Sequence, residues 1–167
     1  HFSMMDAKNN LVMISSASPG VGKSFVSVNL AAVIAQSGRR VLIIDADMRK
    51  GYLHRRLNVE PENGLAEVLA GTLGVTDAIR GTPVEGLDYL SRGNIPSNPS
   101  ELLMGPGFTK LVESLADTYD LVLLDTPPIL AVTDAAIIGA YCGSSMMVAR
   151  FESCTAKEIA AANSRFE

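Results

Sequence analysis

Near the N-terminus, a turn rich in glycine and serine joins an apolar run to an apolar helix and ends in Gly22, Lys23 and Ser24. Glycines at positions 20 and 22 allow backbone N–H groups to converge on one anion, while the following helix adds the positive end of its dipole. Because Lys23 adds an ammonium group, the stretch predicts a phosphate-binding loop. The usual pattern G-x-x-x-x-G-K-[ST] begins with glycine where this chain has Ala17, and a purely structural turn is the alternative interpretation. The predicted contacts to a nucleoside triphosphate are Ser18, Pro19, Gly20, Val21, Gly22, Lys23, Ser24 and Phe25.

Three carboxylates stand directly after apolar runs of the kind expected for buried parallel strands. Asp45 and Asp47 follow residues 41–44, and Asp125 follows residues 121–124. Ligands of open α/β sheets bind beyond the carboxyl ends of the strands, so we expect these side chains at one sheet edge, beside the phosphate-binding loop. A cap on a helix or a turn is the alternative for Asp45 or Asp47.

Together these residues suit nucleoside triphosphate hydrolysis or phosphoryl transfer. Lys23 is expected to reach the β- and γ-phosphates, and Ser24 to ligate Mg²⁺, which keeps several waters and needs only one or two carboxylates. Asp45 and Asp47 compete for two further roles, holding the metal's water shell and accepting a proton from an attacking hydroxyl, and the sequence does not order them. The predicted catalytic residues are Lys23, Asp45 and Asp47, and the predicted metal-site residues are Ser24, Asp47 and Asp125.

These groups need strands that alternate with helices to bring them together. That alternation predicts an α/β fold, a three-layer α/β/α arrangement with a mostly parallel sheet. With the phosphate-binding loop after the first strand, the expected fold is of the P-loop NTPase type. The helix over residues 23–36 is expected to bury Phe25, Val28, Leu30, Val33 and Ile34. Strands are expected over residues 11–14, 41–44, 87–91, 121–124 and 145–149, and helices over residues 23–36, 65–70, 76–80, 108–118, 133–140 and 156–167.

The composition suits one domain. With 167 residues, 47% of them apolar, the chain can bury a substantial core, and a single domain over residues 1–167 is expected, with both ends resembling cuts in a longer protein. A net charge of -4 provides no overall attraction for nucleic acid, and no nucleic-acid partner is expected. For the basic cluster, a solvated helix face and a contact with phosphate or an acidic segment both stay open. The cluster consists of Arg49, Lys50, His54, Arg55 and Arg56.

Several motifs resemble those of one known family. Residues 18–24, 44–52 and 124–128 resemble the Walker A, Walker A′ and Walker B motifs of bacterial tyrosine kinases, and residues 98–103 are similar to a further segment typical of that family. These kinases are the cytoplasmic domains of the polysaccharide co-polymerases that govern capsule and exopolysaccharide export. The resemblance covers nearly the whole chain, and the pairing of Asp45 with Asp47 is more specific than the phosphate-binding loop alone.

The resemblance implies a protein-tyrosine kinase that uses ATP with Mg²⁺ and phosphorylates itself. It also implies self-association, as a ring or dimer, in which the tyrosine-rich tail of one subunit enters the site of its neighbour. The implied location is cytoplasmic, tethered to the bacterial inner membrane through a span in the same chain or in a partner. This chain departs from the family because it lacks the tyrosine-rich tail, its four tyrosines being scattered.

Two regulatory residues carry over by the same resemblance. Tyr52 is similar to a tyrosine that acts as a gate opened by its own phosphorylation, and Arg92 to the arginine that then holds the phosphate. A partly buried Tyr52 and a surface Arg92 without these roles are the alternatives.

Two other functions stay open. A partition or cell-division ATPase of the same P-loop branch resembles this chain, but its loop carries a signature lysine where this chain has Ser18. The basic cluster is the feature that favours DNA, and such phosphate-driven binding would weaken steeply with salt. The second alternative is a nucleotide-binding assembly scaffold without kinase activity.

Overall fold

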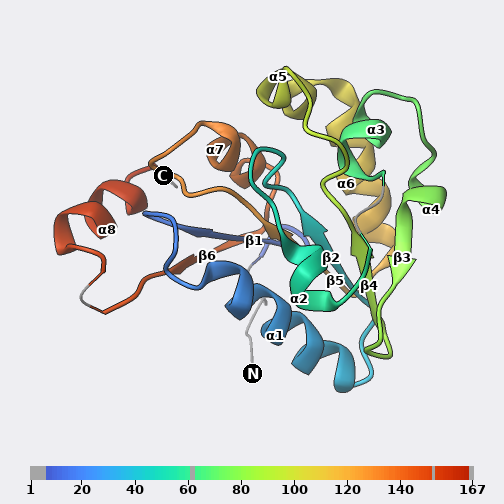
Figure 1. Ribbon diagram of the computed structural model, residues 1–167, viewed down its shortest axis with the longest axis horizontal. Coiled ribbons are helices and arrows are strands. Elements are labelled where there is room, and N and C mark those ends of the chain that lie inside the picture. The colour runs from blue at the N-terminus through green and yellow to red at the C-terminus, as the bar shows by residue number, and fades with distance from the viewer. Residues whose placement is uncertain (1–6, 61–62, 152, 166–167) are drawn as a thin grey trace.

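The sheet of this protein has six strands in the order β3-β4-β2-β5-β1-β6, in a computed structural model that describes residues 7–60, 63–151 and 153–165 (Figure 1). Within those residues, β3 alone runs antiparallel, at the edge beside β4, and every other pairing is parallel. The mostly parallel sheet predicted from the sequence is therefore confirmed. The strands are β1 (Leu11–Ser16), β2 (Val41–Asp45), β3 (Ile79–Gly81), β4 (Leu87–Leu90), β5 (Leu121–Asp125) and β6 (Ser144–Val148).

Alternating strand residues feed two hydrophobic cores, one on each face of the sheet. In β2, Leu42 and Ile44 enter the core that α6 covers together with α3, α5 and α7, which we call the α6 core. Val41 and Ile43 enter the opposite core under α1 and α2, the α1 core. The three-layer α/β/α class is thus confirmed, with helices on both faces (Figure 1). The helices are α1 (Lys23–Gln36), α2 (Leu53–Leu57), α3 (Leu65–Leu69), α4 (Val75–Ala78), α5 (Pro99–Met104), α6 (Pro106–Thr118), α7 (Asp134–Gly139) and α8 (Ala156–Asn163).

The buried face of α1 differs from the prediction. Ser27, Ala31 and Ala35 form the buried stripe, one residue per helical turn, whereas Phe25 is 56% exposed and Val33 is 65% exposed. The expectation that Phe25 and Val33 would be buried is wrong. Val28, Leu30 and Ile34 are only partly buried and lie at the flanks of the stripe. Small side chains let the helix backbone approach the sheet closely, so the larger apolar residues are pushed outward.

The segment around residue 79 also differs from the prediction. A helix was expected over residues 76–80, but α4 ends at Ala78 and the chain continues as β3, whose Arg80 pairs with Tyr89 of β4. A three-residue edge strand is too short to show an alternating pattern, and its stability comes from hydrogen bonds to a partner distant in sequence. Helix α2, which carries much of the basic cluster, lies over the carboxyl end of β2 in the α1 core.

The close approach of α1 to the sheet leads to a prediction about stability. Ala31→Leu should overpack the α1 core, because Ala31 has no exposed surface, and should lower the free energy of unfolding by about 1–3 kcal/mol. Urea denaturation provides the measurement. Val33→Leu, on the exposed side of the same helix, is the control and should change that free energy by less than about 0.5 kcal/mol. Equal effects of the two changes would contradict this packing.

Candidate active site

The loop between β1 and α1 has the backbone form of an anion-binding turn. Gly20 and Gly22 have φ angles of 78° and 94°, in the left-handed region where residues with a Cβ are strained. Gly22 is the N-cap of α1, a helix of 14 residues, so the free N–H groups of its first turn face the loop. Ala17, at the position where the motif pattern has glycine, is 3% exposed and packs into the α6 core. Its methyl group is therefore accommodated without closing the loop.

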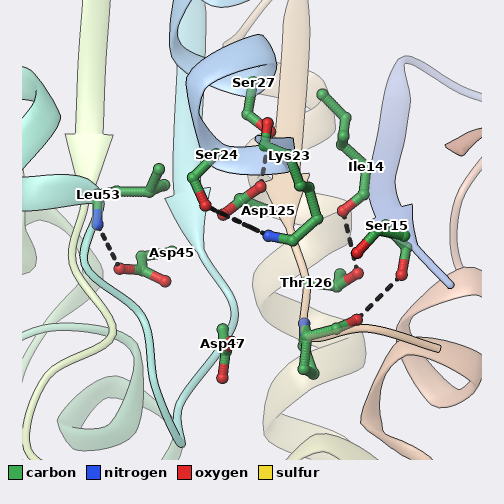
Figure 2. A network of polar contacts seen from close by, with 12 residues as sticks. Ile14, Ser15, Lys23, Ser24, Ser27, Asp45, Asp47, Leu53, Asp125 and Thr126 are labelled. Atoms are coloured by element: carbon green, nitrogen blue, oxygen red, sulfur yellow. Dashed lines mark hydrogen bonds and ion pairs between the residues drawn. The ribbon is translucent and has the colours of Figure 1, made fainter. Parts of the chain in front are cut away.

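Lys23 and Ser24 converge on Asp125 at the carboxyl end of β5. The Lys23 Nζ lies 2.8 Å from Asp125 Oδ2, and the Ser24 hydroxyl donates to the same oxygen at 2.8 Å (Figure 2). Lys23 is 9% exposed and Asp125 is 2% exposed, so the ion pair is largely removed from water. These three predicted residues, more than 100 positions apart at their extremes, do share one site.

Ser27 is a member of this site that the sequence reading missed. Its hydroxyl donates to Asp125 Oδ1 at 2.6 Å, which gives the second carboxylate oxygen its own partner. Ser27 lies one helical turn after Lys23, and it is the polar member of the buried stripe on α1. A serine at i+4 from the loop lysine was the available signal, since such residues share a helix face.

Further hydrogen bonds tie the strand that delivers the loop to the chain that leaves β5. The Thr126 hydroxyl and backbone N–H both donate to the carbonyl of Ile14 at 3.0 Å. The Ser15 hydroxyl donates to the carbonyl of Pro127 at 2.9 Å (Figure 2). Since Ser15 and Thr126 have no exposed surface, these bonds hold the two segments in fixed register.

Asp45 ends β2 and is the register partner of Asp125 on the neighbouring strand. Its side chain turns toward α2, where Oδ2 accepts the backbone N–H of Leu53 at 3.1 Å, while Oδ1 has no hydrogen-bond partner in the described structure (Figure 2). Asp45 has no exposed surface. Burial raises the pKa of Asp45 from 3.8 to about 7, although the Leu53 hydrogen bond acts in the opposite direction, and the charges of Asp125 and Asp47 raise the pKa further.

Gly51 makes this position of Asp45 possible. A Cβ atom built on Gly51 would lie 2.1 Å from Asp45 Oδ1, so any side chain there would displace the carboxylate. The Gly51 N–H donates to the carbonyl of Asp47 at 2.7 Å, which closes a tight turn between β2 and α2. Gly51 therefore allows close packing of the turn against Asp45.

Asp47 occupies a different environment from Asp45. It is partly exposed, and its Oδ1 accepts the backbone N–H groups of Arg49 at 3.2 Å and Lys50 at 2.9 Å. Within the described residues, Asp45, Asp47 and Asp125 do not gather into a cluster of three side chains that holds a metal ion by itself. The capping interpretation and the functional interpretation of Asp47 are compatible, because its second oxygen makes none of these bonds.

The residues present fit a nucleotide with a hydrated magnesium ion. The donors of a phosphate cradle are in place in the glycine turn, and Ser24 and Asp125 supply a hydroxyl and a carboxylate that already meet. Mg²⁺ takes few protein ligands beside phosphate and water, so two or three such oxygens are sufficient. Lys23, Ser24, Asp125 and Asp47 are the residues that would hold the phosphates and the ion.

The other predicted nucleotide contacts lie on the loop or beside it. Pro19 and Gly20 are exposed, and Val21 is buried. The Ser18 hydroxyl lies 3.8 Å from the sulfur of Cys154, which places the segment after β6 against the loop. Phe25 stands outside the cradle, on the exposed face of α1, with the Arg56 guanidinium 5.7 Å from its ring centroid. The loop residues line the candidate site, whereas Phe25 lies at its border.

Within the described residues, the two predicted regulatory residues, Tyr52 and Arg92, share no hydrogen bond and no ring contact. Tyr52 precedes α2 and is 53% exposed, with the Arg55 guanidinium 4.9 Å from its ring centroid. Arg92 follows β4, and its buried Nη1 has no hydrogen-bond partner in the described part of the chain. The His54 ring is 6.3 Å from that of Tyr52, and the pKa of His54 is lowered by burial and then by the charges of Arg55 and Arg92. The side chains of the basic cluster thus have different partners, such as Tyr52 for Arg55 and Phe25 for Arg56.

Comparisons with known proteins show the family of the chain. The family model described as an AAA domain matches residues 9–149. The solved kinase domain of Escherichia coli tyrosine kinase ETK is 50% identical, with a TM-score of 0.95 over 99% of this chain and 65% of that chain. A Klebsiella pneumoniae relative, whose name describes a tyrosine-protein kinase in the cps region, is 53% identical over 167 residues, 100% of this chain. The chain belongs to the AAA domain family and to the bacterial tyrosine kinase family.

The cell-division ATPases among the matched structures are less similar to this chain. The cell division ATPase MinD of Pyrococcus furiosus is 27% identical, with a TM-score of 0.71 over 84% of this chain and 59% of that chain. The kinase resemblance read from the motifs is therefore confirmed over the partition or cell-division alternative. This domain spans 23% of the length of the Klebsiella relative, so the matching stretch is a part of a larger protein there. Within the described residues, no helix has the length and apolar character of a membrane span.

The raised pKa of Asp45 leads to a prediction about pH and stability. Between about pH 4 and pH 7 the unfolded chain gives up the Asp45 proton while the folded domain keeps it, so stability falls as the pH rises and the loss is complete above pH 7. Asp45→Asn keeps an acceptor for Leu53 and removes the buried charge. In EDTA at pH 8, it should raise the free energy of unfolding by roughly 1–3 kcal/mol.

Urea denaturation at pH 5 and pH 8 provides the measurement. At pH 5 the two proteins should differ much less, because folded Asp45 is then protonated. Asp117→Asn, at an exposed carboxylate near the end of α6 and before β5 begins, is the control and should keep the wild-type pH dependence. An Asp45→Asn protein with unchanged pH dependence would show that Asp45 is not the buried titrating group.

Proposed function

We propose that this domain is an ATP-dependent protein-tyrosine kinase, which transfers the γ-phosphoryl group of ATP to a tyrosine hydroxyl in the presence of Mg²⁺. The observation that carries the proposal is the convergence of Lys23 and Ser24 on Asp125 beside a buried Asp45 whose Oδ1 is unpartnered. A phosphate cradle, a metal-side carboxylate and a proton acceptor are the parts that phosphoryl transfer needs. In the reaction, the tyrosine oxygen forms a bond to the γ-phosphorus, the bond to the β,γ-bridging oxygen breaks, and ADP leaves.

Lys23 and Ser24 exchange partners in this proposal. In the structure both contact Asp125, and with ATP present the Lys23 ammonium would bind the β- and γ-phosphates, while Asp125 would hold water of the magnesium shell. Mg²⁺ supplies neutralisation of the charge that develops on the phosphate oxygens. Ser24 would ligate the ion through its hydroxyl. Ser27 keeps Asp125 oriented throughout, because its hydrogen bond is to the other carboxylate oxygen.

The environments of Asp45 and Asp47 separate their roles. Asp45 is proposed to accept the proton of the attacking tyrosine, since its Oδ1 has no other partner. Asp47 is proposed to hold the metal's water shell, since it is partly exposed and its Oδ1 is already engaged by two N–H groups. This difference in burial supports an assignment of the two roles, which the sequence left open.

Tyr52 is proposed to control access to Asp45. Because Asp45 has no exposed surface, a tyrosine hydroxyl can reach it only when the segment before α2 shifts. Leu53, the residue after Tyr52, donates its backbone N–H to Asp45. Phosphorylation of Tyr52 adds about two negative charges, and the unpartnered Nη1 of Arg92 would attract them and draw the segment aside.

Self-association, cellular location and a role in polysaccharide export are part of the same proposal. The resemblance to bacterial tyrosine kinases supports self-association, with a tyrosine-rich tail of one subunit as substrate for its neighbour. A location at the cytoplasmic face of the bacterial inner membrane, and a role in capsule or exopolysaccharide synthesis and export, follow from the same resemblance. The relative named for its place in the cps region supports that role.

A second candidate is a nucleotide-binding scaffold without kinase activity. The complete burial of Asp45 favours it, because a closed site binds nucleotide without accepting a tyrosine. Mg²⁺-ATP and a tyrosine-rich peptide separate the two functions. Phosphotyrosine in the peptide supports the kinase, whereas nucleotide binding without phosphotyrosine supports the scaffold.

Two substitutions test the catalytic assignment. Lys23→Ala and Asp45→Asn should each lower phosphotyrosine formation by roughly 100-fold or more, because one removes the phosphate cation and the other the proton acceptor. Asp45→Asn should keep nucleotide affinity, whereas Lys23→Ala should lower it. Immunodetection of phosphotyrosine and binding of a fluorescent ATP analogue provide the measurements. Normal labelling by both variants would show that the site is misassigned.

The gate is tested by Tyr52→Phe. The phenylalanine keeps the ring that packs near Arg55 and removes the hydroxyl that would carry phosphate. ATP affinity should stay within about twofold of wild type, and kinase activity should fall several-fold because the open state is no longer favoured. Tyr119→Phe, at a tyrosine whose hydroxyl donates to Asp88 away from the site, is the control. Unchanged kinase activity of Tyr52→Phe would remove Tyr52 from the mechanism.

A further inference from the structure

One residue of the basic cluster, Arg49, forms an ion pair with a buried carboxylate while its own side chain stays 40% exposed. The Arg49 Nε donates to Asp134 Oδ2 at 2.8 Å, and its Nη2 donates to Asp134 Oδ1 at 3.2 Å. The Ser100 hydroxyl donates to the same Oδ1 at 2.6 Å and accepts from Arg49 Nη2 at 3.2 Å. These three side chains, which we call the Arg49 clamp, join the turn after β2 to the first turns of α5 and α7. Figure 1 shows that turn reaching up between the two helices.

The acceptor of the clamp is buried, whereas its arginine is partly exposed. Asp134 has no exposed surface, so its charge needs partners that replace water. Although burial alone would raise the pKa of Asp134, the bonds from Arg49 and Ser100 hold it below its ordinary value. A guanidinium bound through two nitrogens also fixes direction, which a lysine in its place could not do.

The clamp acts on the turn that carries Asp47. Asp47 Oδ1 accepts the backbone N–H of Arg49, the residue whose side chain is clamped to Asp134. Met48, between them, is 1% exposed and packs into the α6 core. Met48 in the core and Arg49 in the clamp therefore hold the chain directly after Asp47. Because Arg49 is held, its backbone N–H group, which orients the Asp47 carboxylate, is held as well.

We propose that Arg49, Asp134 and Ser100 are positioning residues for Asp47, which set the direction of its carboxylate toward the magnesium shell of the bound nucleotide. The inference rests on the proposed function, in which Asp47 serves that shell. Partners that orient a metal-side carboxylate typically alter metal affinity when they are removed. The clamp also makes α5 and α7 part of the support of the site, although neither helix supplies a group to the phosphates.

A purely structural role of the clamp predicts a different result. It would make loss of the clamp lower stability while leaving the nucleotide affinity of the folded protein unchanged. A positioning role makes the affinity fall only when Mg²⁺ is present. The deciding quantity is therefore the ratio of nucleotide affinities with and without the metal.

The experiment measures binding of a fluorescent ATP analogue in Mg²⁺ and in EDTA. Asp134→Asn should weaken the affinity in Mg²⁺ by roughly 10-fold, as Asp47→Asn should, and change the affinity in EDTA by less than about twofold. Ser100→Ala should weaken the Mg²⁺ affinity by roughly threefold, and Ser100→Thr, which keeps the hydroxyl, should restore it. Asp120→Asn, which breaks the exposed ion pair of Arg40 at the opposite end of β5, is the matched control.

The outcomes separate the two proposals. If wild-type protein binds the analogue more tightly in Mg²⁺ and Ser100→Ala and Asp134→Asn keep the full metal effect, the positioning role is wrong. If wild-type protein itself shows no metal effect, the proposed function is wrong. Should Asp134→Asn fail to fold, as judged by its circular dichroism, the Ser100→Ala and Ser100→Thr pair decides the question alone.

Discussion

The carboxylate of Asp125 is the group on which the rest of the site depends. Its two oxygens meet Lys23, Ser24 and Ser27 at 2.6 to 2.8 Å, and the side chain is almost fully removed from water. Losing those donors would leave an uncompensated buried charge. The pairing therefore ties the first turn of α1 to the end of β5. Since Thr126 in turn bonds β1, the glycine turn has to close between β1 and α1 at a fixed spacing.

The same sheet edge holds carboxylates with unlike properties because their surroundings differ. Asp45 and Asp125 are register partners on adjacent strands, yet only Asp125 has cationic and hydroxyl donors in the described structure. Asp45 has one backbone donor from Leu53 and a cover formed by the segment before α2, so burial raises its pKa to about 7. Asp47 lies in the turn beyond and is held through its backbone neighbours. Three aspartates near two strand ends thus have three distinct environments.

Much of the fold and of the site could be predicted from local patterns. Continuous apolar runs identified the parallel strands, since a strand buried on both faces needs them. The glycine turn before Lys23 predicted a phosphate-binding loop, and its two glycines do have the left-handed backbone that such a loop uses. The identity of the buried face of α1 could not be predicted, because Val33 and Ala31 are both apolar and only contact with the sheet selects the smaller one. Strand β3 was missed for a related reason, since its stability depends on pairing with β4.

The sequence by itself determined which chemical groups are available and that they follow strand ends, because motif spacing and strand periodicity are local properties of the chain. It could not rank Asp45 against Asp47, because the two differ in burial and in hydrogen-bond partners, which other segments provide. The tertiary structure alone decided that Ser27 completes the shell of Asp125 and that Arg49 binds Asp134. Hydrogen bonds and ion pairs between distant segments depend on how the helices pack on the sheet. The types of the residues alone do not specify that packing.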